Sequence, residues 1–176
     1  MPADEDIGRL LSLVPPPARI DNQIDWRTVE HGLHFRLPAD YKKLIETYGV
    51  GQFDGFIWIL HPTTTNRALR LDAQIELRRQ ILEDVNETFA SPSELTAWAI
   101  TDNGDVCFWL NRGNAVDPSD WRVVVNEGRG PEWDVSNLGS CAWLEHVLSG
   151  RLRVRVFPED FPSESPTFRA GDQPYD

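Results

Sequence analysis

The amino-acid sequence predicts an α+β fold in which an antiparallel sheet of about four to six strands packs against helices from the N-terminal half and the C-terminus. Three observations support this class. Apolar residues recur at helical spacing in several segments. Short runs of β-branched and aromatic residues alternate with turn residues in the second half. The pair Asn103-Gly104 separates two such runs, which is typical of a β-hairpin.

The helices follow from spacing and from the residues that end them. Apolar residues at i, i+3, i+4 and i+7 near the N-terminus predict a helix that three consecutive prolines end. A later helix begins with Pro38 in its first turn and ends at Gly49, a residue that favours the left-handed conformation. Helices are predicted over residues 4–14, 25–30, 38–48, 66–88 and 139–149.

The strands are short apolar runs bounded by turn residues. Residues 49–55 are interpreted as a glycine-rich loop before the first strand, which Pro62 closes. Asn103-Gly104 is predicted to form a type I′ turn, since both residues tolerate φ > 0. In residues 151–157, arginine alternates with apolar residues, and we predict an edge strand protected by charge. Strands are expected over 56–60, 98–100, 106–110, 121–126, 132–135 and 151–157.

Length and composition predict a single domain over residues 1–157, followed by an extended, proline-rich and partly mobile tail over 158–176. The formal net charge is −11, which disfavours nucleic-acid binding. The N-terminus lacks a secretory signal and no run is long enough to cross a membrane, so we expect a cytoplasmic protein with no membrane contact. Cys107 and Cys141 are interpreted as small buried hydrophobes, with a disulfide left open.

No motif for catalysis or cofactor binding is present: the sequence has no GxSxG, P-loop, GxGxxG or HExxH. His31 and His34 have the spacing of a metal-binding pair, but Gly32 between them disfavours a helix. Residues 102–105 resemble part of a calcium loop without its downstream glutamate. We therefore expect no enzyme activity, no cofactor and no metal.

Residues 37–62, LPADYKKLIETYGVGQFDGFIWILHP, resemble the SUKH superfamily. A second stretch, TDNGDVCFWL at 101–110, is similar to the hairpin of that family, and the resemblance spans roughly residues 30–150 in the expected order. The superfamily contains fungal Smi/Knr-type regulators of cell-wall synthesis and bacterial immunity proteins. The matching residues are interpreted as structural: Leu37, Pro38, Tyr41, Tyr48, Gly49, Gly51, Trp58, Pro62 and Gly104.

The resemblance implies a protein that binds another protein, with the unusual backbone angles of Gly49 and Gly51 serving the fold. The first hypothesis is an immunity protein that neutralises a cognate toxin by stoichiometric occlusion of the toxin's active site or substrate groove. Many toxins of this kind are nucleases. The alternative is a regulatory or scaffolding module of the Smi/Knr type. A third, ranked last, is an enzyme or small-ligand binder that uses a cleft near Trp58.

Acidic residues gather in the predicted loops, close in sequence to three tryptophans. If these loops converge at one end of the sheet, they form a negative surface that steers a basic partner. We therefore expect the partner to be another protein, such as a basic toxin domain, and the chain to be a monomer or weak homodimer. The predicted surface consists of Asp54, Asp102, Asp105, Trp109, Asp117, Asp120, Trp121, Glu127, Glu132, Trp133 and Asp134.

Overall fold

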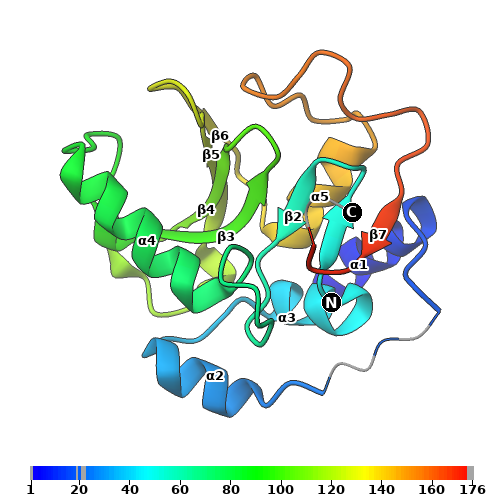
Figure 1. The fold of residues 1–176 in the computed structure, drawn as a ribbon, viewed down its shortest axis with the longest axis horizontal. Helices are drawn as coiled ribbons and strands as arrows, with labels where there is room; N and C mark the ends of the chain where they lie inside the picture. The colour runs from blue at the N-terminus through cyan, green and yellow to red at the C-terminus, as the bar shows by residue number, and fades with distance from the viewer. Residues whose placement is uncertain (1, 19, 21–22, 174–176) are drawn as a thin grey trace.

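A seven-stranded antiparallel sheet organises the protein, and helices lie on both of its faces (Figure 1). The structure is a computed structural model that describes residues 2–18, 20 and 23–173. The strand order is β6-β5-β4-β3-β2-β1-β7, and the α+β class predicted from the sequence is confirmed. The strands are β1 (Gly51–Phe53), β2 (Ile57–Ile59), β3 (Leu95–Thr101), β4 (Val106–Leu110), β5 (Arg122–Asn126), β6 (Trp133–Val135) and β7 (Phe168–Ala170).

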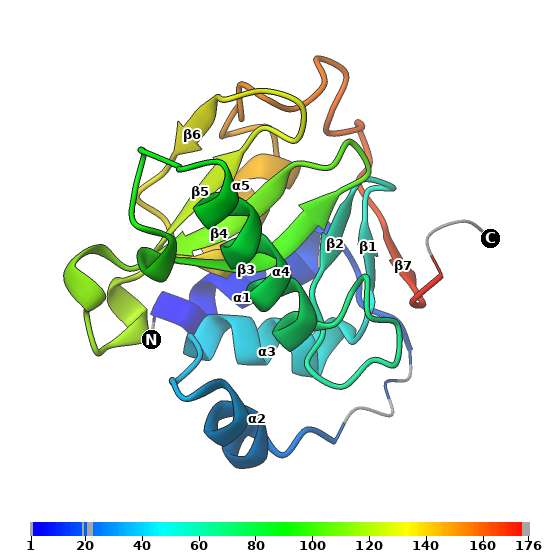
Figure 2. The ribbon, with the colours of Figure 1, turned by 60° about the vertical axis from the view of Figure 1, so that its left-hand side comes forward.

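Three helices cover one face of the sheet, and a fourth covers the other (Figures 1 and 2). On the first face α1, α3 and α5 pack against one another and bury the larger part of the core. On the second face α4 crosses β3, while α2 lies at the periphery. The helices are α1 (Pro2–Leu13), α2 (Trp26–Leu33), α3 (Ala39–Tyr48), α4 (Leu71–Asp84) and α5 (Ser140–Leu148).

Two tyrosines of α3 tie this helix to separate parts of the chain. The Tyr41 hydroxyl donates to the main-chain carbonyl of Leu60, just after β2, at 2.5 Å. The Tyr48 hydroxyl donates to the carbonyl of Val14, just after α1, at 2.6 Å. Both rings are buried, and burial raises the pKa of each hydroxyl above its usual value. These bonds satisfy carbonyls that would otherwise be buried without a partner.

Tryptophans fill the space between the sheet and α5. The register of β3 against β4 shifts between Ala97 and Ala99, which marks a β-bulge at Trp98. The Trp98 ring stacks on Trp109 and meets Trp143 of α5 edge to face, and all three side chains are fully buried. Trp143 therefore belongs to the buried face of α5.

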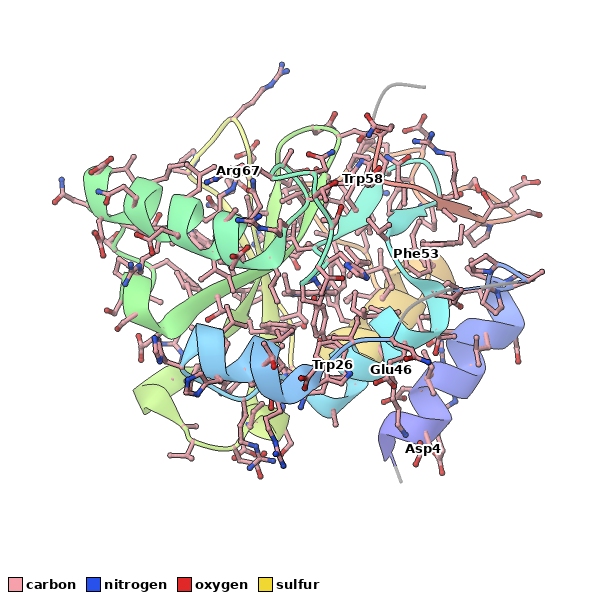
Figure 3. The ribbon with its side chains drawn as sticks, turned by 60° about the horizontal axis from the view of Figure 1, so that its bottom comes forward. Asp4, Trp26, Glu46, Phe53, Trp58 and Arg67 are labelled. Carbon is pink, nitrogen blue, oxygen red and sulfur yellow. The ribbon has the colours of Figure 1, made fainter. Side chains whose placement is uncertain are left out.

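The peripheral helix α2 is attached to α3 by polar contacts. Trp26 Nε1 donates to Glu46 Oε1 at 2.5 Å (Figure 3). Lys42 forms an ion pair with Glu30, whose carboxylate also accepts the Leu37 N–H at 2.8 Å. The entry to α3, where Pro38 is the N-cap residue, is therefore fixed by a side chain of α2.

Three predictions about the sheet were wrong. Residues 51–53 are not a loop: they form β1 and pair with β2. Residues 151–157 form no strand, and Arg155 instead bonds the edge of β6 through Asp134 and the Trp133 carbonyl. The tail is not only an extended appendage, since β7 pairs with β1 through Gly51↔Ala170, Gln52↔Arg169 and Phe53↔Phe168. The sheet consequently has seven strands instead of four to six.

The turn type was also predicted at the wrong hairpin. Asn103 is not among the residues with positive φ, whereas Gly104 has φ = 89°, and the Gly104 N–H bonds the Thr101 carbonyl. This geometry is that of a three-residue loop with glycine at its left-handed position. The φ signature of a type I′ turn occurs in the β1–β2 turn, where Asp54 and Gly55 have φ of 51° and 61°.

Candidate functional site

The turns of the β1–β2, β3–β4 and β5–β6 hairpins lie together at one end of the sheet, at the top of Figure 1. The Asp102 N–H donates to the Phe56 carbonyl at 3.1 Å, which joins the first two turns. The Gly128 N–H donates to Asp105 Oδ1 at 2.9 Å, which joins the second and third. Antiparallel topology makes this convergence necessary, because alternate connections of a meander share one end.

The C-terminal segment adds acidic residues to the same end. Phe161 packs against Phe56 with ring centroids 4.7 Å apart, and Ser163 donates to the Asp54 carboxylate from both its N–H and its hydroxyl. We define the hairpin-tip surface as residues 54–56, 102–105, 127–132 and 158–164. These segments hold eight carboxylates and one basic side chain, Arg129. The tail carboxylates Glu159, Asp160 and Glu164 are exposed and were not among the predicted residues.

Several acidic residues of the predicted surface have structural roles. Asp105 is buried, and besides Gly128 it accepts the Thr101 hydroxyl at 2.8 Å. Asp134 is buried and bonds the Arg155 N–H at 3.1 Å. By contrast, Glu132 is exposed and Glu127 is half-buried, while the main chains of these two residues close the β5–β6 turn. The exposed carboxylates of the hairpin-tip surface are thus those of Asp102, Glu132 and the tail.

The remaining predicted residues do not join this surface. Asp117 and Asp120 are exposed but lie in the β4–β5 connection, at the opposite end of the sheet. Trp109 and Trp121 are buried in the core. The predicted surface is therefore divided. The residues of the hairpin turns converge at one end of the sheet, Asp117 and Asp120 lie at the other end, and Trp109 and Trp121 are inside the core.

Trp133 is the one predicted tryptophan that is only partly buried. It lies on β6, where its ring stacks on Phe89 with centroids 4.4 Å apart. Its indole Nε1 is buried with no hydrogen-bond partner. The stacked pair lies beside the β5–β6 turn, and its ring edges add apolar area next to the carboxylates.

Asp102 and Trp58 belong to a cluster that fixes the tail on the sheet. Trp58 Nε1 donates to Asp102 Oδ1 at 2.8 Å, and Gln52 donates to both oxygens of the same carboxylate at 3.0 Å. Arg169 of β7 lies over the Trp58 ring and bonds the Gln52 side chain at 3.1 Å. The Trp58 indole, labelled in Figure 3, is thus enclosed instead of lining the predicted cleft.

The glycines of the family pattern have distinct roles. Gly49 ends α3 with φ = 71° and Gly104 lies in the β3–β4 turn with φ = 89°, as their predicted structural role requires. Gly51 differs, since it lies within β1 and its φ is not positive. A Cβ atom there would be closer than 3.0 Å to the Phe168 ring and the Arg169 carbonyl. Gly51 is therefore needed for the close approach of β7, not for a backbone angle.

No group of three or more potential metal ligands was found among the described residues. Burial lowers the pKa of His61 to about 4, so its imidazole is neutral at pH 7. A groove of about 510 Å³ lies between the 32–35 segment, α4 and Trp121. Its lining is mostly apolar. In the described part of the chain, no helix is long and apolar enough to cross a membrane.

The antiparallel sheet, the helices on both of its faces and the acidic end built from hairpin turns define a domain of the α+β class. A family model described as SMI1-KNR4 cell-wall matches residues 23–137, more than half of the chain. The protein belongs to this family, and so to the SUKH superfamily. No curated protein and no solved structure matches the chain. The matched region covers α2 through β6, so α1, α5 and β7 lie outside it.

Proposed function

We propose that the protein is a cytoplasmic immunity protein that neutralises a cognate toxin by binding it stoichiometrically through the hairpin-tip surface. Membership in the SUKH superfamily supports a protein-interaction role. The observation that carries the choice of surface is the convergence of eight carboxylates, all except buried Asp105 at least partly exposed, at one end of the sheet, against Arg129 and the neighbouring Arg153. Binding, not catalysis, is the proposed activity.

The charge of this surface selects the chemistry of the partner. A face of this sign attracts a basic protein and raises the association rate. Toxins that act on nucleic acids carry basic grooves for phosphate, so an acidic protein that covers such a groove excludes the substrate. An interface of about 1,600 Å² is sufficient for specific binding.

Co-expression with the toxin domain encoded beside this gene tests the proposal, with cell survival and co-purification as readouts. We expect survival and a one-to-one complex. The double substitution Glu127→Lys and Glu132→Lys should abolish protection, because it reverses charge on the β5–β6 turn. The matched control, Glu5→Lys with Asp120→Lys, makes the same change in net charge at exposed positions elsewhere and should retain protection. Equal loss in both variants would show that net charge, not this surface, matters.

The second candidate is a regulatory module that binds a housekeeping partner, which the description of the matching family as SMI1-KNR4 cell-wall favours. This function needs no toxin gene nearby. A chain that fails to protect against the neighbouring toxin, yet purifies from its native cells with one stoichiometric partner, would support regulation over immunity. The same lysine variants then test whether that partner uses the hairpin-tip surface.

A further inference from the structure

Helix α4 carries a line of exposed apolar side chains. Leu77, Ile81 and Val85 follow at intervals of four, so they lie along one side of the helix over about 12 Å. Their exposed fractions are 47%, 41% and 63%. Only two other large apolar residues of the described chain, Val116 and Val135, are as exposed. We call Leu77, Ile81 and Val85 the α4 stripe.

The α4 stripe lies on the flank of the helix nearer the hairpin turns. The other flank of α4, with Ile75 and Arg79, lines the groove that reaches Asn111 and Trp121 at the far end of the sheet. Leu77 and Ile81 lie about 160° around the helix from Arg79, and Val85 lies about 120° from it, on the reverse flank. The chain that leaves α4 continues to Phe89, which stacks on Trp133 of β6. The stripe therefore leads toward the hairpin-tip surface.

Arg78 lies one turn before Ile81, whereas the charges at the C-terminal end of the stripe are all acidic and oppose helix stability. Glu83 and Asp84 occupy the last turn of α4, which holds no basic residue. Carboxylates are unfavourable there because the helix dipole places negative charge at the C-terminus. Glu87 follows within three residues. A cationic partner at this end would relieve the repulsion, whereas a second copy of the chain would bring further carboxylates to it.

We propose that the α4 stripe and its acidic C-terminal end form a docking ridge for a protein partner that presents apolar side chains flanked by lysine or arginine. The ridge adds apolar contacts beyond those of the Phe89–Trp133 pair, and fully desolvated apolar residues contribute most to affinity. The choice of a basic protein as occupant rests on the proposed function. The position of the ridge follows from the structure alone.

The test uses a fluorescent amphipathic helical peptide of leucine and lysine, with a leucine and glutamate peptide of equal length as its counterpart. Fluorescence anisotropy should show saturable binding of the lysine peptide that weakens with salt. The pair Ile81→Ser and Val85→Ser should weaken binding at least about tenfold. Val116→Ser, which changes a still more exposed apolar residue in the β4–β5 connection, should leave binding unchanged. Leu77→Ser provides a second variant if the pair disturbs folding.

Equal binding by the stripe variant and wild type would overturn the ridge, as would equal binding of the glutamate peptide or no binding at all. A concentration-dependent dimer that the stripe variant abolishes would also overturn it, because the occupant would then be a second copy. The peptide assay and the toxin assay test separate claims. Peptide binding without protection against the toxin would contradict the immunity function but not the ridge. A stripe variant that binds the toxin normally and still protects would contradict the ridge but not the immunity function.

Discussion

Substituting Gly51 by alanine should release β7 from the sheet while leaving the rest of the fold intact. The new methyl group would be closer than 3.0 Å to the Arg169 carbonyl oxygen and to the Phe168 ring. The ring could turn away, but the carbonyl belongs to the main chain of β7. Relief of this contact therefore requires the strand itself to move.

The size of the effect follows from the contacts that β7 makes. Overpacking by one methyl group costs about 1–3 kcal/mol. On the other side, Phe168 packs on Tyr48 and Phe53 with centroids 5.0 and 4.8 Å apart, and such ring pairs contribute about 0.5–1.5 kcal/mol each beyond burial. The two amounts are comparable, so detachment is an accessible way to relieve the strain. A clash of about 2 kcal/mol would raise the detached fraction about thirtyfold.

Amide hydrogen exchange measures this detachment directly. The Asp54 N–H donates to the Thr167 carbonyl at 2.7 Å, and the Gly171 N–H donates to the Val50 carbonyl at 3.0 Å. Both amides should exchange about thirtyfold faster in Gly51→Ala. The Val123 N–H, which bonds the Leu138 carbonyl at 2.9 Å, is remote from β7 and should keep its protection.

Two results would refute this reasoning. Unchanged exchange at Asp54 and Gly171 would mean that β7 tolerates the methyl group. Equal acceleration at Val123 would mean that the whole domain, not one strand, is destabilised. A chain that stops at Pro166, and so lacks β7, completes a double-mutant cycle with Gly51→Ala. In the truncated chain, Gly51→Ala should change the free energy of urea unfolding by almost nothing. If the substitution costs the same with and without β7, the strain does not arise from contact with β7.

Three further predictions concern stability. Tyr41→Phe and Tyr48→Phe should each lower the free energy of unfolding by about 1–2 kcal/mol, additively, because each removes a separate buried hydrogen bond; urea unfolding of both single variants and the double variant checks this. Asp40 accepts the Cys141 N–H at 2.9 Å, and burial raises the pKa of its carboxyl, so its stabilising contribution is present below the unfolded pKa and is lost as pH rises through the folded pKa. Asp40→Asn should therefore gain stability relative to wild type as pH rises through the titration of this buried carboxyl, whereas a difference that stays constant with pH would contradict the assignment. Gly128→Ala should cost about 1–3 kcal/mol, since its Cβ would meet the main chain of the β3–β4 turn, and wild-type thermal stability would show that the turns are not packed as described.

The sequence pattern predicted best where one local rule decides the outcome. The helix from Pro38 to Gly49 and the strands on either side of residues 101–105 follow from apolar spacing and glycine placement, and they were found as predicted. The type I′ signal was assigned to Asn103-Gly104, although Asp54-Gly55 between two phenylalanines has the same form. The flanking glycines at 49 and 51 made that segment resemble a loop, because a glycine required by strand contact cannot be distinguished from one required by a turn.

The C-terminal third was harder, since tertiary contacts decide it. Alternation in residues 151–157 predicted a strand, but Val154 is buried while Arg155 gives its N–H to the side chain of Asp134 instead of to a neighbouring strand. Likewise, β7 is only three residues long, and it can pair with β1 because Gly51 has no side chain at the point of contact. For the candidate site, the convergence of the hairpin turns could be anticipated from antiparallel connectivity. The contribution of the tail could not, because it depends on Phe161 and Ser163 meeting residues about one hundred positions earlier.

The last residues of the chain protect both edges of the sheet. Arg155 occupies the outer side of β6, and β7 covers β1 at the other edge. During synthesis these residues emerge after all the strands that they cover. Until then both edges carry unpaired main-chain groups that can join to another chain. A chain cut before residue 150 therefore keeps a nearly complete sheet with both edges open, which is its most aggregation-prone form, so residues 151–170 protect the molecule against joining to other copies.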